Sequence, residues 1–215
     1  MRCQFRRMLV AVAIVFGVLG TIQNSNGEMA RWQVDRDHST VGFQVAHMVI
    51  SQTHGKFTDY DGFIEMDPET QKVKTLEAVI RTQSVFTDHP KRDEHLRGPD
   101  FFDVEKHSTM VYKMKNYKKT GDGYTAVGDL TLLGVTKEIT LVGTFNGTTQ
   151  DPWGNTRAGF TAEGTINRQD FGMKFSKTLD NGGLLVGDEV KIKLDIECIK
   201  EKQPTNEPVK HSKTH

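Results

Sequence analysis

One stretch decides the fold class of this chain, and it reads Val190-Lys191-Ile192-Lys193-Leu194-Asp195-Ile196-Glu197-Cys198. Apolar residues alternate strictly with charged residues along it. A period of two places the apolar side chains on one face of a β-strand and the charged side chains on the other. One wet face is typical of an antiparallel sheet, whereas the strands of a parallel sheet are buried on both faces. The stretch therefore predicts an antiparallel strand.

The same alternation recurs along most of the chain. It runs through further segments at 41–47, 54–66, 76–80, 110–114, 124–132, 139–145 and 158–166. Turn signals separate many of these segments, namely Asp67-Pro68, Gly121-Asp122-Gly123, Gly134, Asn146-Gly147 and Asn181-Gly182-Gly183. Within 54–66, Phe57 and Ile64 fall on opposite parities, which predicts a bulge or bend near Asp61-Gly62. About eight antiparallel strands predict an all-β fold closed into a barrel, because closure removes the exposed sheet edges.

The apolar parity of each strand gives the residues that are expected to line the barrel interior. They are Phe43, Val45, Ile64, Leu76, Ala78, Ile80, Met110, Tyr112, Met114, Leu130, Leu132, Ile139, Leu141, Phe160, Ala162, Gly164, Ile192 and Leu194. Small members such as Ala78, Ala162 and Gly164 have two interpretations. They let opposite walls of a packed core meet, or they leave an open lumen. Composition leaves both open, and the size of an eight-stranded barrel, which fits one small ligand, favours the lumen.

Residues 82–103 interrupt the strand pattern with a dense group of Asp, Glu, His and Arg residues and two adjacent Phe residues. One interpretation is a metal or catalytic cluster built from His89, Asp93 and His95. On a helix His89 and Asp93 share a face, but His95 lies well round from His89, and the H-E-x-x-H pattern is missing. The sequence therefore favours the second interpretation, a polar helix that caps the barrel, and predicts no metal site.

The helical cap is expected to be held by charged pairs. Its structural residues are predicted to be Arg92, Asp93, His95, Asp103 and Arg168. Arg92 and Arg97 are expected to neutralise Asp93, Asp100 and Asp103, because arginine forms well-defined forks with carboxylates. Arg168 is expected to pair with an acid near the helix, and Gly172 to allow a tight bend after it.

Other residues with chemical potential have structural interpretations. Asp35, Asp37 and His38 lie together at a strand entry, and His47 lies on an inner parity. A single inward histidine is more often a hydrogen-bonded core residue than a catalyst. Cys198 is on an apolar parity with no adjacent base, which indicates an inert buried thiol. No Gly-x-Ser-x-Gly elbow or phosphate loop is present, so the sequence predicts no catalytic residue and no cofactor.

The ends of the chain differ from the strand-rich middle. Arg2, Arg6 and Arg7 precede an apolar run at 8–19, which predicts a signal peptide over residues 1–27 that is cleaved before Glu28. Residues 200–215 hold a single aliphatic side chain, and this composition predicts a disordered tail after a domain at 28–199. Removal of the three arginines leaves 25 basic residues against 28 acidic ones, a net charge of −3. That balance argues against a nucleic-acid partner.

Several ordered segments resemble the YceI-like family of periplasmic lipid-binding barrels. They lie at 32–39, 55–57 with His47 before them, 84–88, 92–96, 100–103, 128–136, 166–172 and 186–190. The resemblance covers about residues 32–199. It implies an extended lipocalin-like antiparallel barrel, with one helix inserted between middle strands and a long apolar channel. It also implies a periplasmic location and a ligand of polyisoprenoid or isoprenoid-quinone type.

Three functions follow as hypotheses. The first is a periplasmic carrier of a long apolar lipid, held in the lumen and exchanged through transient membrane contact. The second is a metal-dependent or His/Asp enzyme that uses His47, His89 and His95. The third is a structural or stress barrel with a filled core. The carrier is preferred, the protein is not expected to be an enzyme, and the sequence leaves monomer and homodimer open.

Overall fold

The structure is a computed structural model that describes residues 28–178 and 182–202. The strands are β1 (Ala30–Val34), β2 (Thr40–His47), β3 (Ser51–Phe57), β4 (Tyr60–Asp67), β5 (Lys72–Arg81), β6 (Val85–Phe86), β7 (Thr109–Thr120), β8 (Gly123–Leu132), β9 (Val135–Gln150), β10 (Thr156–Asn167) and β11 (Val186–Lys200). The helices are α1 (Pro90–Arg97) and the short 3-10 turns η1 (Arg36–His38), η2 (Thr82–Ser84) and η3 (Arg168–Phe171). In the part of the chain that is described, no helix has the length and apolar character needed to cross a bilayer.

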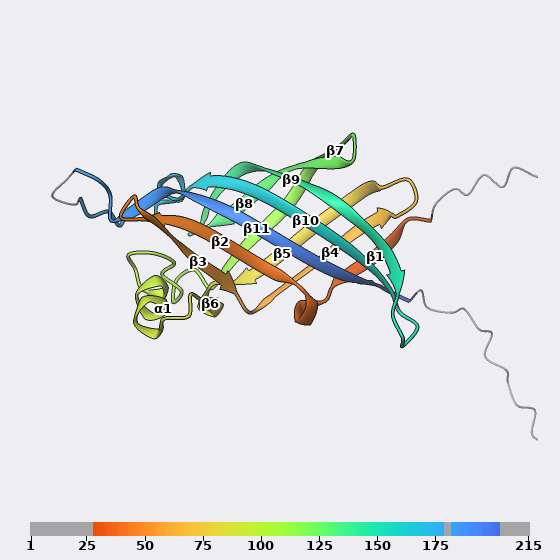
Figure 1. Cartoon of the computed structure of the whole chain (residues 1–215), viewed down its shortest axis with the longest axis horizontal. Coiled ribbons are helices and arrows are strands. Elements are labelled where there is room, and N and C mark those ends of the chain that lie inside the picture. Colours follow the sequence, from red (N-terminus) through yellow and green to blue (C-terminus); the bar gives the residue numbers. More distant parts are fainter. Residues whose placement is uncertain (1–27, 179–181, 203–215) are drawn as a thin grey trace, which may run out of the picture.

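All strand pairs are antiparallel, and pairing of β1 with β11 closes the sheet into a barrel (Figure 1). Residues 198–200 of β11 pair with β1, and residues 186–195 pair with β2. Strands β1 and β2 therefore act as one strand of the wall. Strands β3 and β4 likewise share a second position, and strands β5 and β6 share a third. This gives the closed eight-stranded antiparallel barrel that the alternation predicted, with α1 inserted between β6 and β7.

The bend predicted near Asp61-Gly62 lies elsewhere. Asp61 and Gly62 pair regularly with β5, and the wall breaks at Thr58 and Asp59, between β3 and β4. There the amide of Thr58 donates to Ser84 O at 3.1 Å, and Asp59 O accepts from the amide of Arg81 at 2.9 Å. These bonds satisfy the backbone at the break. The alternation is interrupted at this break, so Phe57 before it and Ile64 after it both face the interior although their sequence parities differ.

The barrel is packed differently at its two ends. At the end distant from α1, Trp32 is fully buried among Met66, Ala158 and Cys198, and its indole nitrogen donates to Met66 O at 3.4 Å. At the α1 end, Phe57 and Phe102 meet edge to face at 5.5 Å between ring centroids. Members of both clusters, among them Met66, Cys198, Phe57 and Phe102, also line the space inside the barrel.

Helix α1 begins where local chemistry predicts a helix start. The side chain of His89 caps it by accepting from the amide of Arg92 at 3.3 Å, and Pro90 occupies the first turn, where no amide donor is needed. Only Asp93 is buried on this helix. The helix is thus a polar cover at one end of the barrel, as predicted (Figure 1).

The predicted domain boundary at 199 is close to the end of the sheet. Strand β11 continues to Lys200, and the amide of Glu201 donates to Arg31 O at 2.9 Å. Lys200 and Glu201 therefore belong to the barrel rather than to the tail. The predicted signal peptide at 1–27 and the tail from 203 onward lie outside the described residues.

Candidate ligand cavity

A cavity of about 450 Å³ runs through the barrel interior. Strands from every part of the wall contribute to its lining, together with α1 and the segment that follows η3. Of the interior residues predicted from the sequence, all but Met114 and Gly164 line it. This volume lies within the range of sites that hold a small organic ligand.

Met114 keeps the inward parity of its strand and packs against the hydrophobic cluster, but it does not line the cavity, and a bulge follows directly after it. The pairing of β7 with β8 shifts register between Met114 and Asn116. One extra residue moves every later side chain to the opposite face. Tyr117, on the other parity, lines the cavity beyond the bulge. The alternation stops at Met114, Asn116 lies at the bulge, and Tyr117 resumes on the other parity; these three signals together could have indicated the change of face.

Gly164 also stands outside the lining. A Cβ atom at this position would lie 2.7 Å from Leu141 Cδ2 and 2.9 Å from the carbonyl oxygen of Thr140. Leu141 therefore covers the inner surface that Gly164 would have offered. Any larger side chain at this position, phenylalanine included, would collide with the backbone whether or not the barrel has a lumen. Gly164→Phe would therefore not distinguish an open interior from a filled one.

The apolar side chains of β11 show that the interior is open. Val190, Ile192, Leu194 and Ile196 all line the cavity, and all remain partly exposed. Elsewhere in the wall, Leu132 of β8 is 3% exposed. Inward side chains of a filled core would be buried on every wall, because interiors pack to the density of crystals. Of the two interpretations of the small inner residues, the structure supports the lumen.

Polar side chains with hydrogen-bonding capacity line the cavity at its α1 end, namely Arg92, His95 and His47. Arg168, Asp61 and Glu77 also belong to the lining, which is otherwise mainly aliphatic and aromatic. His95 lies 2.9 Å from Asp100 and packs edge to face against Phe101 and Phe175, at 5.0 and 5.1 Å between ring centroids. An elongated ligand with an apolar chain and a polar head matches this arrangement.

The ion pairs predicted for the cap do not form. Nε of Arg92 donates to Thr87 Oγ1 at 2.7 Å, and Nη2 donates to Thr87 O at 2.7 Å. Asp93 accepts from the amide of Thr87 at 2.8 Å and from its hydroxyl at 2.5 Å. The guanidinium of Arg97 donates to two backbone carbonyls, those of Gln83 and Val85.

The remaining acids of the predicted cap have local partners. Asp103 pairs with Lys106 at 2.8 Å, and Asp100 pairs with His95. The backbone of residues 83–87 has too few strand partners of its own, so its polar groups attract the helix side chains. The cap is therefore fastened by side chain–backbone hydrogen bonds rather than by carboxylate forks.

Arg168 is fully buried and does pair with an acid, but on another element. Its guanidinium donates to Met173 O at 2.7 Å, to Gly187 O at 2.8 Å and to Asp188 Oδ1 at 2.8 Å. Asp188 lies near the start of β11, at the end of the barrel where α1 lies (Figure 1). Gly172 has φ +87°, so the predicted tight bend is confirmed. Arg168 joins the turn after β10 to the start of β11.

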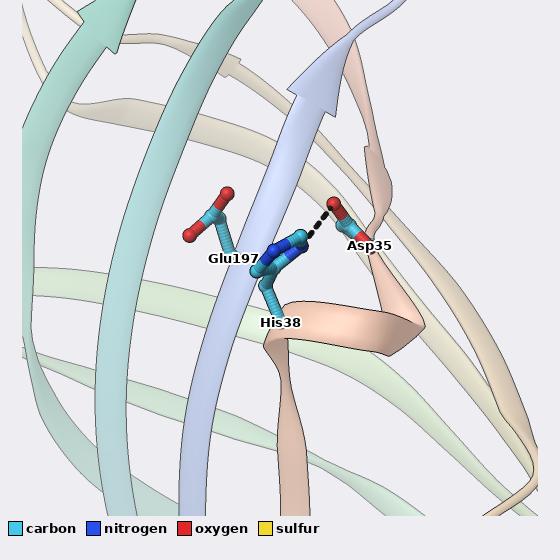
Figure 2. Close-up of side chains that lie close together, drawn as sticks. All are labelled: Asp35, His38 and Glu197. Carbon is cyan, nitrogen blue, oxygen red and sulfur yellow. Dashed lines mark hydrogen bonds and ion pairs between the residues drawn. The ribbon is translucent and has the colours of Figure 1, made fainter. Parts of the chain in front are cut away.

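One group in the described residues could in principle hold a cation, and it consists of Asp35, His38 and Glu197 (Figure 2). His38 Nδ1 lies 2.9 Å from Asp35 Oδ2. However, Nη1 of Arg157 bonds to both carboxylates, at 2.5 Å to Asp35 Oδ2 and closely to Glu197. A guanidinium already neutralises the two acids, so the group is an ion-pair network between the η1 corner, β10 and β11.

The same guanidinium also binds the turn between β9 and β10. Its Nε donates to Asp151 Oδ2 at 2.8 Å. Burial acts to raise the pKa of Asp151, but hydrogen bonds from Arg157 and Asn155 outweigh it and hold the pKa well below its usual range. Burial likewise acts to raise the pKa of Asp35, and bonds from Arg157 and His38 lower it overall. The role of Arg157 could not be predicted from the sequence, because no local pattern links it to acids 6, 40 and 122 residues away.

The histidines of the enzyme hypothesis do not converge on a metal site within residues 28–178 and 182–202. His89 caps α1, and His47 ends β2. No group of His, Cys, Asp or Glu that includes them lies close enough to share an ion there. Burial raises the pKa of the Cys198 thiol to about 12, so the thiol stays protonated at neutral pH. These placements give the cavity no evident nucleophile.

Comparisons with known proteins agree with this geometry. The family model described as the YceI-like domain matches residues 32–198. A UPF0312 protein of Yersinia pestis (strain Pestoides F) is 38% identical over 175 residues, which cover 80% of this chain and 88% of that protein. A UPF0312 protein of Pseudomonas putida is 39% identical over 171 residues, which cover 75% of this chain and 89% of that protein.

Solved structures show the same fold. The YceI protein of Campylobacter jejuni is 32% identical, with a TM-score of 0.63, over 74% of this chain and 90% of that chain. A polyisoprenoid-binding domain from Saccharophagus degradans has a TM-score of 0.60 at 14% identity, over 81% of this chain and 100% of that chain. At that identity the second likeness concerns the fold alone.

Proposed function

The chain belongs to the YceI-like family, and from this premise we propose that it carries one long apolar lipid of polyisoprenoid or isoprenoid-quinone type in its barrel. The observation that supports the proposal most is the partly exposed apolar face of β11 inside a closed barrel. Partly exposed apolar surface is costly unless it is covered, and an apolar chain would remove it from water.

Two further observations support a lipid rather than a compact ligand. The cavity is lined from the Trp32 end to α1, so it suits an elongated molecule. A fold neighbour of this chain is a polyisoprenoid-binding domain. The polar side chains His47, Arg92 and His95 offer partners for a head group at one end.

We propose the periplasm as the place of action. The support is the run of Arg2, Arg6 and Arg7 followed by the apolar segment at 8–19. N-terminal sequencing of protein from a periplasmic extract is expected to begin near Glu28. A protein that keeps Met1 and stays in the inner membrane would contradict this location.

Native mass spectrometry tests the carrier function. Protein purified without detergent from its own cell envelope is expected to carry one additional mass that organic extraction removes. Protein that has been delipidated and refolded serves as the control, and it is expected to regain the same mass after incubation with the extract. If the native protein carries no lipid and the refolded protein takes up none, the carrier function is wrong.

A further inference from the structure

The turn between β2 and β3 exposes an unusual group of large apolar side chains. Met48 is 38% exposed, Val49 is 70% exposed and Ile50 is 86% exposed. The three residues are consecutive and form the tip of a hairpin at the α1 end of the barrel (Figure 1). We call Met48, Val49 and Ile50 the apolar tip. Its side chains make a contiguous apolar projection rather than scattered surface residues.

The backbone of the apolar tip is unfavourable for the residues that it holds. Met48 has φ +52° and Val49 has φ +67°. Two successive residues with positive φ are typical of hairpin turns that favour Asn-Gly, and a β-branched residue in this region is a genuine outlier. Strain of this kind is concentrated at functional sites. The turn therefore holds bulky apolar side chains where local stability alone would favour small or polar ones.

The apolar tip lies at the entrance of the cavity. The amide of Met48 donates to Leu185 O at 3.0 Å, which ties the tip to the segment before β11. The residues next to this bond, Ala46, His47 and Val186, line the cavity together with Leu185. A surface that contacts the tip would thus lie directly against the entrance.

Exposed lysines lie on the segment beside the apolar tip. Lys174 and Lys177 are exposed, and the amide of Leu185 donates to Lys177 O at 2.8 Å, which places this segment beside the tip. The segments 45–56, 172–178 and 182–187 contain no Asp or Glu. Neither lysine forms an ion pair with any described residue. An apolar projection flanked by cations matches the surface of an anionic bilayer.

We propose that the apolar tip inserts into an anionic lipid bilayer and holds the cavity entrance against the membrane, where a lipid can move between bilayer and barrel. This inference rests on the proposed carrier function. Three side chains are too few for a stable protein interface, which buries about 800 Å² on each partner. They suffice for a transient membrane contact that cations reinforce.

The substitution pair Val49→Gly with Ile50→Ser tests the tip without harming the fold, because glycine suits the positive φ of residue 49. Co-sedimentation with vesicles of phosphatidylcholine and phosphatidylglycerol is the assay. The wild type is expected to bind these vesicles, and less so at high salt. The double variant is expected to bind at least about tenfold more weakly, since two exposed aliphatic side chains are lost.

Trp153→Ser is the matched control. Trp153 is 78% exposed, like the tip residues, but it lies on the β9–β10 turn at the opposite end of the barrel. Its loss is expected to leave vesicle binding unchanged. If Trp153→Ser weakens binding as much as the double variant does, general surface hydrophobicity explains the binding and the proposal is wrong.

A dansyl-labelled fatty acid in solution separates this proposal from the carrier function. All three proteins are expected to bind it alike. Failure of the wild type to bind any apolar molecule would reject the carrier function, whatever the vesicle result. If wild type and double variant bind vesicles equally and bind the probe normally, the proposed role of the tip is wrong while the carrier function stands. If the wild type is a dimer, the double variant is a monomer and neither binds vesicles, the tip serves self-association and the proposal is also rejected.

Discussion

Ile192→Trp distinguishes an open lumen from a filled one. Ile192 lies in the middle of β11, opposite Gly164 on one side and Phe43 on the other, and its partly exposed side chain lines the cavity. In an open lumen the indole enters free space and covers additional apolar wall. Each Å² of apolar wall that the ring covers contributes roughly 25 cal/mol, which offsets the strain of the larger side chain. The free energy of unfolding is therefore expected to change by no more than about 1 kcal/mol. In a packed interior the same ring would cost about 1–3 kcal/mol.

Thermal unfolding measures the difference. For a domain of this size each kcal/mol moves Tm by about 2–4 °C. Ile192→Trp is therefore expected to change Tm by no more than a few degrees. The matched control is Val85→Trp, because Val85 is fully buried and does not line the cavity. This control is expected to lower Tm by clearly more.

Ligand binding gives the second readout of Ile192→Trp. An indole that takes the place of two or three methylenes of a bound chain removes about 0.8 kcal/mol each, so affinity falls on the order of tenfold or more. Fluorescence titration with a dansyl-labelled fatty acid measures this loss. A Tm as low as that of the Val85 control would show a filled interior. A normal Tm with unchanged affinity would show that the ligand binds elsewhere, and either result refutes the reasoning.

Three other substitutions test the packing around the cavity. Arg157→Met removes the hydrogen-bond partner of Asp35, whose pKa is lowered in the folded protein, so the pairing stabilises the fold above about pH 4 and is lost as the carboxyl is protonated at lower pH. The Tm deficit of the variant is therefore expected to be largest near pH 7 and to shrink below about pH 4. A pH-independent deficit would contradict the network. Arg168→Met leaves buried carbonyls and a carboxylate without their donor, and it is expected to lower the free energy of unfolding, measured in urea, on the order of 3–5 kcal/mol. A decrease under about 1 kcal/mol would show that water reaches these groups. Gly143→Ala would push a methyl group into the carbonyl of Thr161, and its cost is expected to be roughly 1–3 kcal/mol or more, with wild-type stability counting against the close approach of β9 and β10.

Three features of the structure differ from the sequence predictions or were absent from them, each for its own physical reason. The predicted pairs of Arg92 were wrong because Thr87, which bears no charge, offers both a hydroxyl and a carbonyl at the correct distance. Met114 was assigned to the lumen because it shares the parity of Met110 and Tyr112; it packs against the inner hydrophobic cluster but lies outside the cavity lining. Arg157 was missed because its acidic partners are brought together only when β10 and β11 pair. Only the partners of Arg157 are distant in sequence, whereas Thr87 is five residues from Arg92 and lies next to the short strand β6.

Alternation along the chain was enough to assign the fold class and most of the inner face. Successive side chains of a strand point to opposite sides, so a period of two reports the buried face without any knowledge of the neighbours. Ile192 and Leu194 could therefore be placed toward the interior from the sequence alone. The volume between the walls is a different kind of property, because it depends on how all the strands of the barrel tilt and on which side chains meet across it. Only the tertiary structure decided that these two side chains face open space, where a ligand fits, rather than the opposite wall.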